Sequence, residues 1–373
     1  MTKILHLGLI GYGQGRMYAD TLRCYRVFYP NLPEVELTAI CTLSLPESQR
    51  ALTISGFKRI QNDFNELINS SDIDIIIIAT PPSTHYSYLK ACLYTQKGIF
   101  LDKPLSIDFN HANELITLSK ELSRDARLGF QYRFNPALLY AKDLINSGVL
   151  GEIYNYRATY NRSSAVKNNK SLGWKGNIEL CGDGVLFDYG PHPIDLINWL
   201  VGIPEKVSAI RKIFIPKRPR SREDMDLVEI TTADHYTILF SSSNGPVGSL
   251  DLGRLIVGSE NDLSIQLYGS KGSISWSLMD PNFLYKADIS YKSNKGVAWE
   301  KIPTIQKYPG LDFPSGDSPM GLFRMHLASM ADFISSFIQN QSFVPGIIDG
   351  YNVQKILNAC VISANNNCWQ DVN

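Results

Sequence analysis

A histidine between two prolines, with aspartates on either side, marks a candidate proton-transfer site. In LFDYGPHPIDLINWL, residues 186–200, His192 follows Asp188 by four positions and precedes Asp195 by three. An imidazole titrates near neutral pH and can take a proton from a hydroxyl group. Because prolines are tolerated near a helix start, a helix is expected to begin between Gly190 and His192. Asp195, in its first turn, either joins the chemistry or complements the helix dipole.

A lysine supplies the second candidate group. Asp102, Lys103 and Pro104 follow the short apolar strand pattern GIFLD. The carboxyl ends of strands in a doubly wound sheet are where ligands bind, and an ammonium group there stabilises the alkoxide that develops when a hydride leaves an alcohol carbon. Taken alone, Lys103 would be read as a surface lysine. Together with His192 and a glycine loop, it indicates catalysis.

The glycine loop GLIGYGQGRM lies where the first strand should turn into the first helix. Gly11 and Gly13 fit the first two positions of a dinucleotide-binding fingerprint, in which the backbone approaches a pyrophosphate at a helix N-terminus. The third glycine is expected at position 16, which is Arg16, and Gly15 comes one residue early. The residues expected to surround the cofactor here are Gly11, Tyr12, Gly13, Gln14, Gly15 and Arg16.

The end of the second strand bears on the choice between NAD and NADP. NAD-preferring folds place an acid there, whereas this chain has Thr42, and Glu47 is expected to come too late in the sequence. Thr42 and Ser44 are able to donate hydrogen bonds to a 2′-phosphate, and Arg16 or Arg50 is able to neutralise it. The sequence therefore predicts NAD or NADP, with a slight preference for NADP.

The first third of the chain alternates strand and helix patterns. The strand patterns are KILHLGLI, EVELTAICTL, DIDIIIIAT, GIFLD and ARLGF. Asp63 with Glu66 forms a capping-box pattern before one helix, and Ser83 or Thr84 is expected to cap the next. The alternation predicts an α/β Rossmann domain with a doubly wound parallel sheet over residues 1–124.

The pattern changes after residue 124. One amphipathic helix is expected to end at Gly148, and the strand patterns GEIYNYRATY, VEITTA, YTILFSS, VGSLDL, LSIQLYG and GSISW follow, with turn signals between several of them. Two helical patterns close the chain, at 322–338 and 351–364. Residues 125–373 are therefore predicted to form an α+β domain with a large, mostly antiparallel open sheet that binds substrate and mediates oligomerisation.

Composition excludes several classes of protein. Lys+Arg and Asp+Glu both number 36, so no overall charge favours a nucleic acid or a membrane surface. The basic run PKRPRSRED, residues 216–224, is interpreted as a solvated hairpin tip. The six cysteines are scattered without a CxxC pair, which predicts free thiols and no metal site. With no leader-like N-terminus and no run of about 20 apolar residues, a cytoplasmic location is expected.

The chain resembles the Gfo/Idh/MocA oxidoreductases, a family named for glucose–fructose oxidoreductase and inositol dehydrogenase. The similar features occur in family order: GLIGYGQG, IIIIATPPSTH, LDKPL with Asp102 where Glu is usual, QYRFNP and DYGPHPIDLINWLVG. The resemblance is effectively full length. Its most specific parts are the Lys-Pro element and the G-x-H-x-x-D element.

The resemblance implies roles for individual residues. Lys103 and Asp102 would adjoin the nicotinamide, with a Lys103–Pro104 peptide that is often cis, while Asp188 and His192 would form the pair that exchanges the hydroxyl proton. Further residues are implied at lower specificity: Thr80, Pro81 and His85 on the nicotinamide side, and Tyr160, Arg162 and Trp174 at the substrate. Lys103, Asp188 and His192 are expected to contact the substrate as well.

The resulting hypothesis is an NAD(P)-dependent dehydrogenase or reductase that acts on a sugar, a cyclitol or a nucleotide-linked sugar. Two alternatives remain open: a non-catalytic sensor of the same fold that binds cofactor and sugar, and a redox-assisted glycoside hydrolase. The family resemblance also implies a homodimer or homotetramer.

Overall fold

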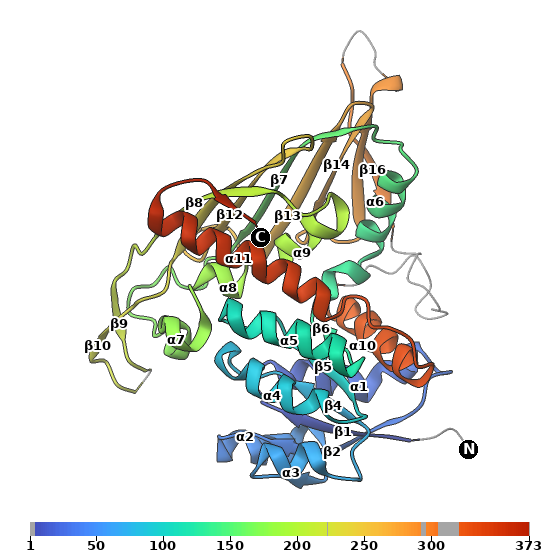
Figure 1. Ribbon diagram of the computed structural model, residues 1–373, viewed down its shortest axis with the longest axis vertical. Helices are drawn as coiled ribbons and strands as arrows, with labels where there is room; N and C mark the ends of the chain where they lie inside the picture. The colour runs from blue at the N-terminus through green and yellow to red at the C-terminus, as the bar shows by residue number, and fades with distance from the viewer. Residues whose placement is uncertain (1–3, 222, 292–295, 305–320, 373) are drawn as a thin grey trace. The chain divides into compact units, whose positions relative to one another are not determined.

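The chain folds into two compact units, drawn in Figure 1. The computed structural model describes residues 4–221, 223–291, 296–304 and 321–372. Within these ranges, the first unit contains residues 4–131 and Phe323–Tyr351, and the second contains residues from 132 to 304, residues 321–322 and residues from 352 onward. The first unit thus extends past the predicted boundary at residue 124 and includes a helix from the end of the chain. The functional assignment of 1–124 and 125–373 stays a prediction.

The first unit contains a six-stranded parallel sheet in the order β3-β2-β1-β4-β5-β6. Its strands are β1 (Leu5–Ile10), β2 (Val35–Cys41), β3 (Arg59–Ile60), β4 (Ile75–Ile78), β5 (Gly98–Leu101) and β6 (Arg127–Leu128). All four isoleucines of β4 are fully buried, as in a central parallel strand covered on both faces. The strand order reverses between β1 and β4, and this reversal is the place where doubly wound sheets bind ligands. The predicted Rossmann fold is confirmed.

Helices flank this sheet. They are α1 (Gly15–Phe28), α2 (Leu45–Arg50), α3 (Phe64–Asn69), α4 (His85–Leu93), α5 (Phe109–Leu122) and, from the end of the chain, α10 (Leu322–Ile338). Asp63 caps α3 as predicted, because its carboxylate accepts a hydrogen bond from Asn65 N. Thr84 precedes α4 but makes no side-chain cap. The core cluster of this unit includes Leu327, Met330, Phe333 and Ile334 of α10, so the predicted closing helix belongs to this core.

The second unit is built on a nine-stranded sheet in the order β16-β15-β14-β13-β7-β12-β11-β8-β17. Its strands are β7 (Ile153–Asn161), β8 (Lys206–Lys212), β11 (His235–Ser241), β12 (Val247–Gly253), β13 (Asp262–Gly269), β14 (Gly272–Ser277), β15 (Phe283–Asp288), β16 (Glu300–Pro303) and β17 (Gln370–Asp371). Only β7 and β12 pair in parallel; the other described pairs are antiparallel. This confirms the predicted large, mostly antiparallel sheet.

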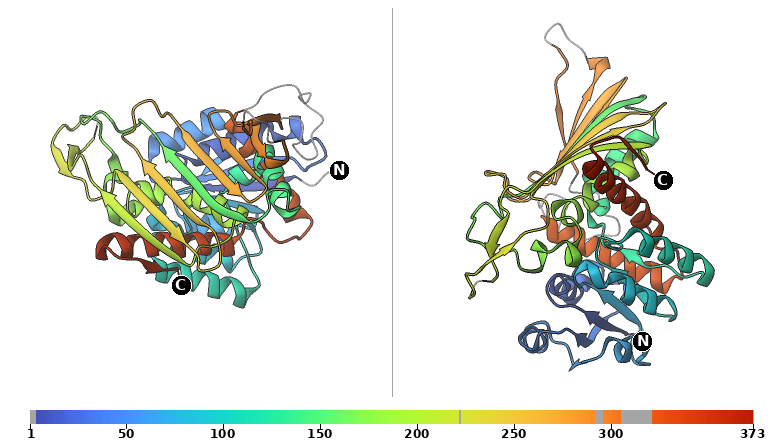
Figure 2. Two further views of the ribbon diagram at one scale, coloured as in Figure 1. Left: turned by 90° about the horizontal axis from the view of Figure 1, so that it is seen from above. Right: turned by 60° about the vertical axis from the view of Figure 1, so that its left-hand side comes forward.

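The described helices of the second unit lie on one face of this sheet (Figure 2). They are α6 (Pro136–Asn146), α7 (Ile178–Cys181), α8 (Val185–Asp188), α9 (Pro191–Leu200) and most of α11 (Ile347–Asn366). Strand burial alternates accordingly: Tyr236, Ile238 and Phe240 of β11 are buried, and the residues between them are not. The helix α6 ends just before Gly148, which has a positive φ of 71°, as predicted.

Two expectations for the second unit need correction. VEITTA does not join the large sheet; β10 (Leu227–Glu229) pairs only with β9 (Lys217–Pro219) in a separate hairpin. The basic run is not wholly solvated either, because Arg218 is fully buried. No helix among the described residues is both long and apolar enough to cross a membrane, and the six cysteines are free thiols.

Candidate functional site

The glycine loop after β1 leaves room for a ligand at its tip. Gly11 has a φ of 88°, and a Cβ there would lie 2.4 Å from the Ala79 carbonyl oxygen, so only glycine lets the loop cross the end of β4 so closely. A Cβ on Gly13 would meet nothing within 4 Å. Gln14 makes no side-chain cap at the start of α1. The amides of Arg16 and Met17 donate to Tyr12 O and Gln14 O at 2.9 Å each, so a ligand would be bound by the amides that precede them in the loop. The loop fits a pyrophosphate.

The displaced third glycine is explained by packing. A Cβ on Gly15 would lie 2.9 Å from Leu9 Cδ1 of β1, so Gly15 performs the close helix-to-strand packing expected of the third fingerprint glycine. Arg16 is half-exposed and pairs with Asp20 at 3.2 Å. The side chain of Tyr12 points into the core, where its hydroxyl lies 2.8 Å from Ser55 Oγ. The departure at Arg16 therefore leaves the close packing of α1 on β1 intact.

The end of β2 carries a carboxylate after all. Thr42 Oγ1 donates a hydrogen bond to Glu47 Oε2 at 3.2 Å. Ser44 caps α2 by accepting from Glu47 N at 3.4 Å, which folds the first turn of the helix back toward the strand. The expectation that Glu47 comes too late was wrong, because a capped helix begins immediately after the strand.

Lys103 follows β5 on a braced turn. Its peptide with Pro104 is cis, as the family resemblance implied. Asp102 Oδ1 accepts hydrogen bonds from Lys103 N at 2.9 Å and from the hydroxyl of Tyr18, on α1, at 2.8 Å. Burial, followed by the charge of Asp102, holds the pKa of Tyr18 well above its usual value, so the phenol remains a donor. The Asp102 carboxylate thus links α1 to the turn that bears the lysine.

His85 is buried between the loop after β4 and the turn after β5. It is fully buried, with Nδ1 2.7 Å from Pro104 O and Nε2 3.0 Å from Thr80 O. Burial lowers its pKa, against the carbonyls and Asp102, which favour the charged ring. The imidazole joins the loop after β4 to the turn after β5. Thr80 and Pro81 are half-buried, and of the three residues implied on the nicotinamide side they alone have surface to offer a ligand.

In the second unit, His192 sits in the first turn of α9 among tyrosines. The helix begins at Pro191, as predicted. His192 is 6% exposed, and its ring lies edge-on to Tyr132 with centroids 4.8 Å apart. The Tyr132 hydroxyl is 3.3 Å from that of Tyr160, which donates to Asn261 Oδ1 at 2.9 Å. The histidine is therefore held by packing in one orientation.

Asp188, at the end of α8, is paired with a lysine that sequence reasoning missed. Lys175 Nζ lies 2.8 Å from Asp188 Oδ2. Burial opposes the Lys175 ammonium, but the charge of Asp188 and its hydrogen bond outweigh burial and raise the pKa of Lys175. In the sequence, the one signal that pointed to Lys175 was its position directly after Trp174. In the structure, Trp174 is 41% exposed.

The predicted substrate residues of the second unit gather around the same helices. The ring of Tyr160, 5% exposed, is 5.2 Å from the ring of Tyr189. The guanidinium of Arg162 lies 5.8 Å from the centre of Tyr189, and its Nε donates to Glu260 O at 3.2 Å. Exposed Trp174 lies next to Lys175, whose ammonium is 5.5 Å from the centre of the indole ring and pairs with Asp188. Substrate binding by Tyr160, Arg162 and Trp174 stays a prediction.

Asp195 has a structural partner. It accepts two hydrogen bonds from Arg133, from Nε at 2.9 Å and from Nη2 at 2.6 Å, and both side chains are buried. A bidentate, buried pair of this kind fixes α9 on the segment that precedes α6. The sequence left two roles open for Asp195, the helix dipole and proton transfer. The ion pair with Arg133 accounts for its geometry more directly than either.

Asp195→Asn should lower the free energy of unfolding by about 3–5 kcal/mol, because it leaves the Arg133 charge buried without its counter-ion. Urea denaturation followed by circular dichroism measures the change. Asp371→Asn is the matched control, because the Lys206–Asp371 pair is exposed at 54% and 58% and its loss should cost less than about 1 kcal/mol. Equal stabilities of the two variants would contradict the assignment.

Among the described residues, no three His, Cys, Asp or Glu side chains are grouped to hold a metal ion.

Two family models match the chain. The oxidoreductase family with an NAD-binding Rossmann fold covers residues 5–130, and the GFO/IDH/MocA C-terminal domain covers residues 138–275. The chain belongs to the Gfo/Idh/MocA family of oxidoreductases, as the sequence motifs predicted. It is a dinucleotide-dependent oxidoreductase, the class to which its homologues belong.

Individual relatives resemble the chain over its whole length. Levoglucosan dehydrogenase of Pseudarthrobacter phenanthrenivorans is 26% identical over 99% of this chain and 98% of its own. D-glucoside 3-dehydrogenase of Escherichia coli is 23% identical over 96% of this chain and 95% of its own. A solved structure of levoglucosan dehydrogenase in complex with NADH is 26% identical and covers 100% of both chains with a TM-score of 0.93.

Proposed function

We propose that the protein transfers a hydride between a nicotinamide dinucleotide and a secondary alcohol, or the corresponding ketone, of a sugar, glycoside or cyclitol. The observation that carries this proposal is the pairing of Asp188 with Lys175 beside exposed Trp174, on the same unit as His192. Relatives named for levoglucosan, D-glucosides and inositol support this substrate class.

The bound cofactor supplies the hydride acceptor for oxidation and the donor for reduction. In oxidation, the substrate hydroxyl loses its proton to His192, and the Lys103 ammonium stabilises the oxygen as negative charge develops on it. Asp188 orients the hydroxyl or the imidazole, and Lys175 holds that carboxylate in place through their 2.8 Å ion pair. Reduction runs through the same groups in reverse. The cytoplasmic location and the homo-oligomeric state stay predictions.

The test combines binding and turnover. Purified protein is titrated with NADH and NADPH by fluorescence, and levoglucosan, methyl glucosides, myo-inositol and free aldoses are then screened with the preferred cofactor. We expect cofactor reduction with at least one neutral polyol. Cofactor binding without turnover of any polyol would favour the sensor, and release of a free sugar without net cofactor reduction would identify redox-assisted hydrolysis.

We further propose that the cofactor is NAD rather than NADP. The hydroxyls of Thr42 and Ser44 alone favoured NADP slightly, but each is engaged with Glu47. A carboxylate at the end of β2 binds the ribose hydroxyls of NAD and repels a 2′-phosphate. That the family model is NAD-binding and that a solved relative holds NADH also support the proposal.

Glu47→Gln should narrow the preference for NADH over NADPH by about 10-fold, because one like-charge repulsion worth roughly 1–2 kcal/mol is removed. The dissociation constants of both cofactors, measured by fluorescence titration, give the ratio. Glu66→Gln is the control, since Glu66 contacts only Gln61 on an exposed surface among its described hydrogen bonds. A wild-type protein that binds NADPH more tightly would overturn the assignment to Glu47.

A further inference from the structure

The hairpin of β9 and β10 carries one arginine whose side chain is withdrawn from solvent. Arg218 on β9 is 0% exposed, although Lys217 beside it and Arg220 two residues on are exposed. Its Nη2 donates to Ala165 O at 2.7 Å, and its Nη1 donates to Lys167 O at 2.8 Å and Lys170 O at 3.2 Å. All three acceptors belong to one loop, residues 162–177, which connects β7 to α7; we call it the substrate loop.

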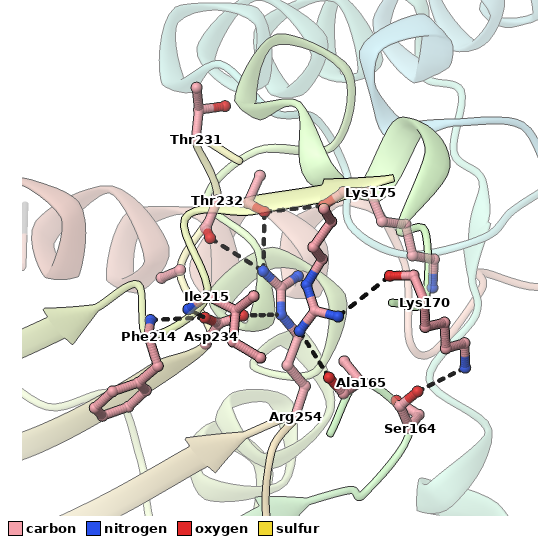
Figure 3. A network of polar contacts seen from close by, with 12 residues as sticks. Ser164, Ala165, Lys170, Lys175, Phe214, Ile215, Thr231, Thr232, Asp234 and Arg254 are labelled. Carbon is pink, nitrogen blue, oxygen red and sulfur yellow. Dashed lines mark hydrogen bonds and ion pairs between the residues drawn. The ribbon is translucent and has the colours of Figure 1, made fainter. Parts of the chain in front are cut away.

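A second buried arginine holds the other end of the substrate loop (Figure 3). Arg254, just after β12, donates from Nη2 to the Thr232 hydroxyl at 3.2 Å. That hydroxyl in turn donates to Lys175 O at 3.0 Å. The Nε of Arg254 donates to Asp234 Oδ1 at 2.6 Å, so this guanidinium has a carboxylate partner.

The arrangement is costly unless the loop is in place. Burial lowers the pKa of Arg218, the charge of Asp234 opposes this change, and Arg254 adds to it. In the described part of the chain, the Arg218 guanidinium donates to backbone carbonyls. A guanidinium buried in this way is stable only while carbonyl dipoles surround it, and therefore only while the loop keeps its shape.

Other contacts also hold the substrate loop: Ala165 N donates to Arg254 O at 3.1 Å, the Ser171 hydroxyl donates to Arg220 O at 2.8 Å, and Thr231 N donates to Gly176 O at 3.1 Å. Arg218 adds the side-chain donors that bind the carbonyls of residues 165, 167 and 170. The only regular element of the loop is one short 3₁₀ turn, Gly173–Gly176. Within the loop, Lys170 Nζ donates to Ser164 O at 2.6 Å, and the Ser164 hydroxyl lies 3.3 Å from the Tyr189 hydroxyl. Arg218 thus binds the backbone carbonyls of the first half of the loop, and Trp174 and Lys175 follow in its second half.

We propose that Arg218 is a positioning residue for substrate recognition: it fixes the backbone of the substrate loop, and thereby the placement of Lys175 against Asp188 and of Trp174. This inference rests on the proposed function for its consequence and on the hydrogen bonds above for its cause. Arg218 itself is fully buried, so it acts through the loop. It sets which polyols the loop accepts.

The test is Arg218→Gln with Arg218→Lys as the conservative variant and Arg220→Gln as the matched control. Arg220 lies on the same hairpin, but its side chain is 61% exposed and pairs with Asp224. Arg218→Gln should raise KM for the best polyol at least 10-fold, change kcat less than threefold and leave the Kd of NADH within twofold. The KM of Arg218→Lys should lie between those of Arg218→Gln and the wild type, because the lysine ammonium replaces only part of the hydrogen bonds that the guanidinium makes. Arg220→Gln should match the wild type.

Hydrogen exchange separates this inference from the proposed function, because it needs no substrate. In the full chain with saturating NADH, amides of residues 163–177 should exchange at least 10-fold faster in Arg218→Gln, with β11 unchanged. Should that variant fail to fold, Arg218→Lys carries the same comparison with a smaller increase. Unchanged exchange in the loop, or a loss of NADH affinity equal to the loss of substrate affinity, would overturn the inference. Faster exchange in a protein that turns over no polyol would support the role of Arg218 in fixing the substrate loop and would contradict the proposed function alone.

Discussion

Lys103→Met should reduce kcat/KM for polyol oxidation by about 10³-fold while the Kd of NADH stays within about threefold. Methionine keeps most of the length of the side chain and removes the ammonium, so the variant loses the charge that stabilises the developing alkoxide, an effect worth about 10²–10³ in rate for one well-placed donor. The backbone bonds of the turn persist, because Asp102 accepts from Lys103 N and from Tyr18 independently of the lysine side chain.

The informative comparison is between kcat and KM. A group that acts mainly on the transition state lowers kcat and kcat/KM together, whereas a group that only binds substrate raises KM. Lys90→Met is the matched control, because Lys90 is an exposed lysine of the same unit that pairs with Glu114. If Lys103→Met retains more than a tenth of the wild-type kcat, the lysine is not the group that stabilises the alkoxide.

Much of the fold was predictable because its signals are local. The four isoleucines of β4 identify a strand buried on both faces, and glycines 11, 13 and 15 follow directly on β1. The role of Gly15 was not predictable from spacing alone. Its importance comes from contact with Leu9 on the neighbouring strand, and only the crossing of α1 over β1 shows that contact.

Glu47 illustrates a signal that was present and misread. Ser44, Pro46 and Glu47 have the spacing of a helix start, with an N-cap hydroxyl and an acid three residues later. Counting residues from the strand placed the carboxylate too far away. Counting from the capped helix places it beside Thr42, as the structure does.

The contacts that shape the second unit lie far apart in sequence. Arg218 meets carbonyls about 50 residues earlier, and Arg133 meets Asp195 across 62 residues. A basic run in a hairpin is solvated in most proteins, so burial of one of its arginines has no local signal. The same holds for α10: its apolar pattern shows that the helix is buried but not which of two sheets it covers.

His192→Asn should lower kcat/KM for oxidation by about 10²–10⁴-fold, the range for loss of one general acid–base group. In the wild type, kcat/KM for oxidation should fall as the pH drops, because a protonated imidazole cannot accept the hydroxyl proton; the variant should lose this acidic limb. The primary kinetic isotope effect with substrate deuterated at the reacting carbon should rise, because the chemical step becomes rate-limiting.

His235→Asn, at a half-exposed histidine of the same unit, should leave the pH profile unchanged. Retention of the acidic limb in His192→Asn would assign proton transfer to another group. The packing of His192 against Tyr132 then has a structural role only.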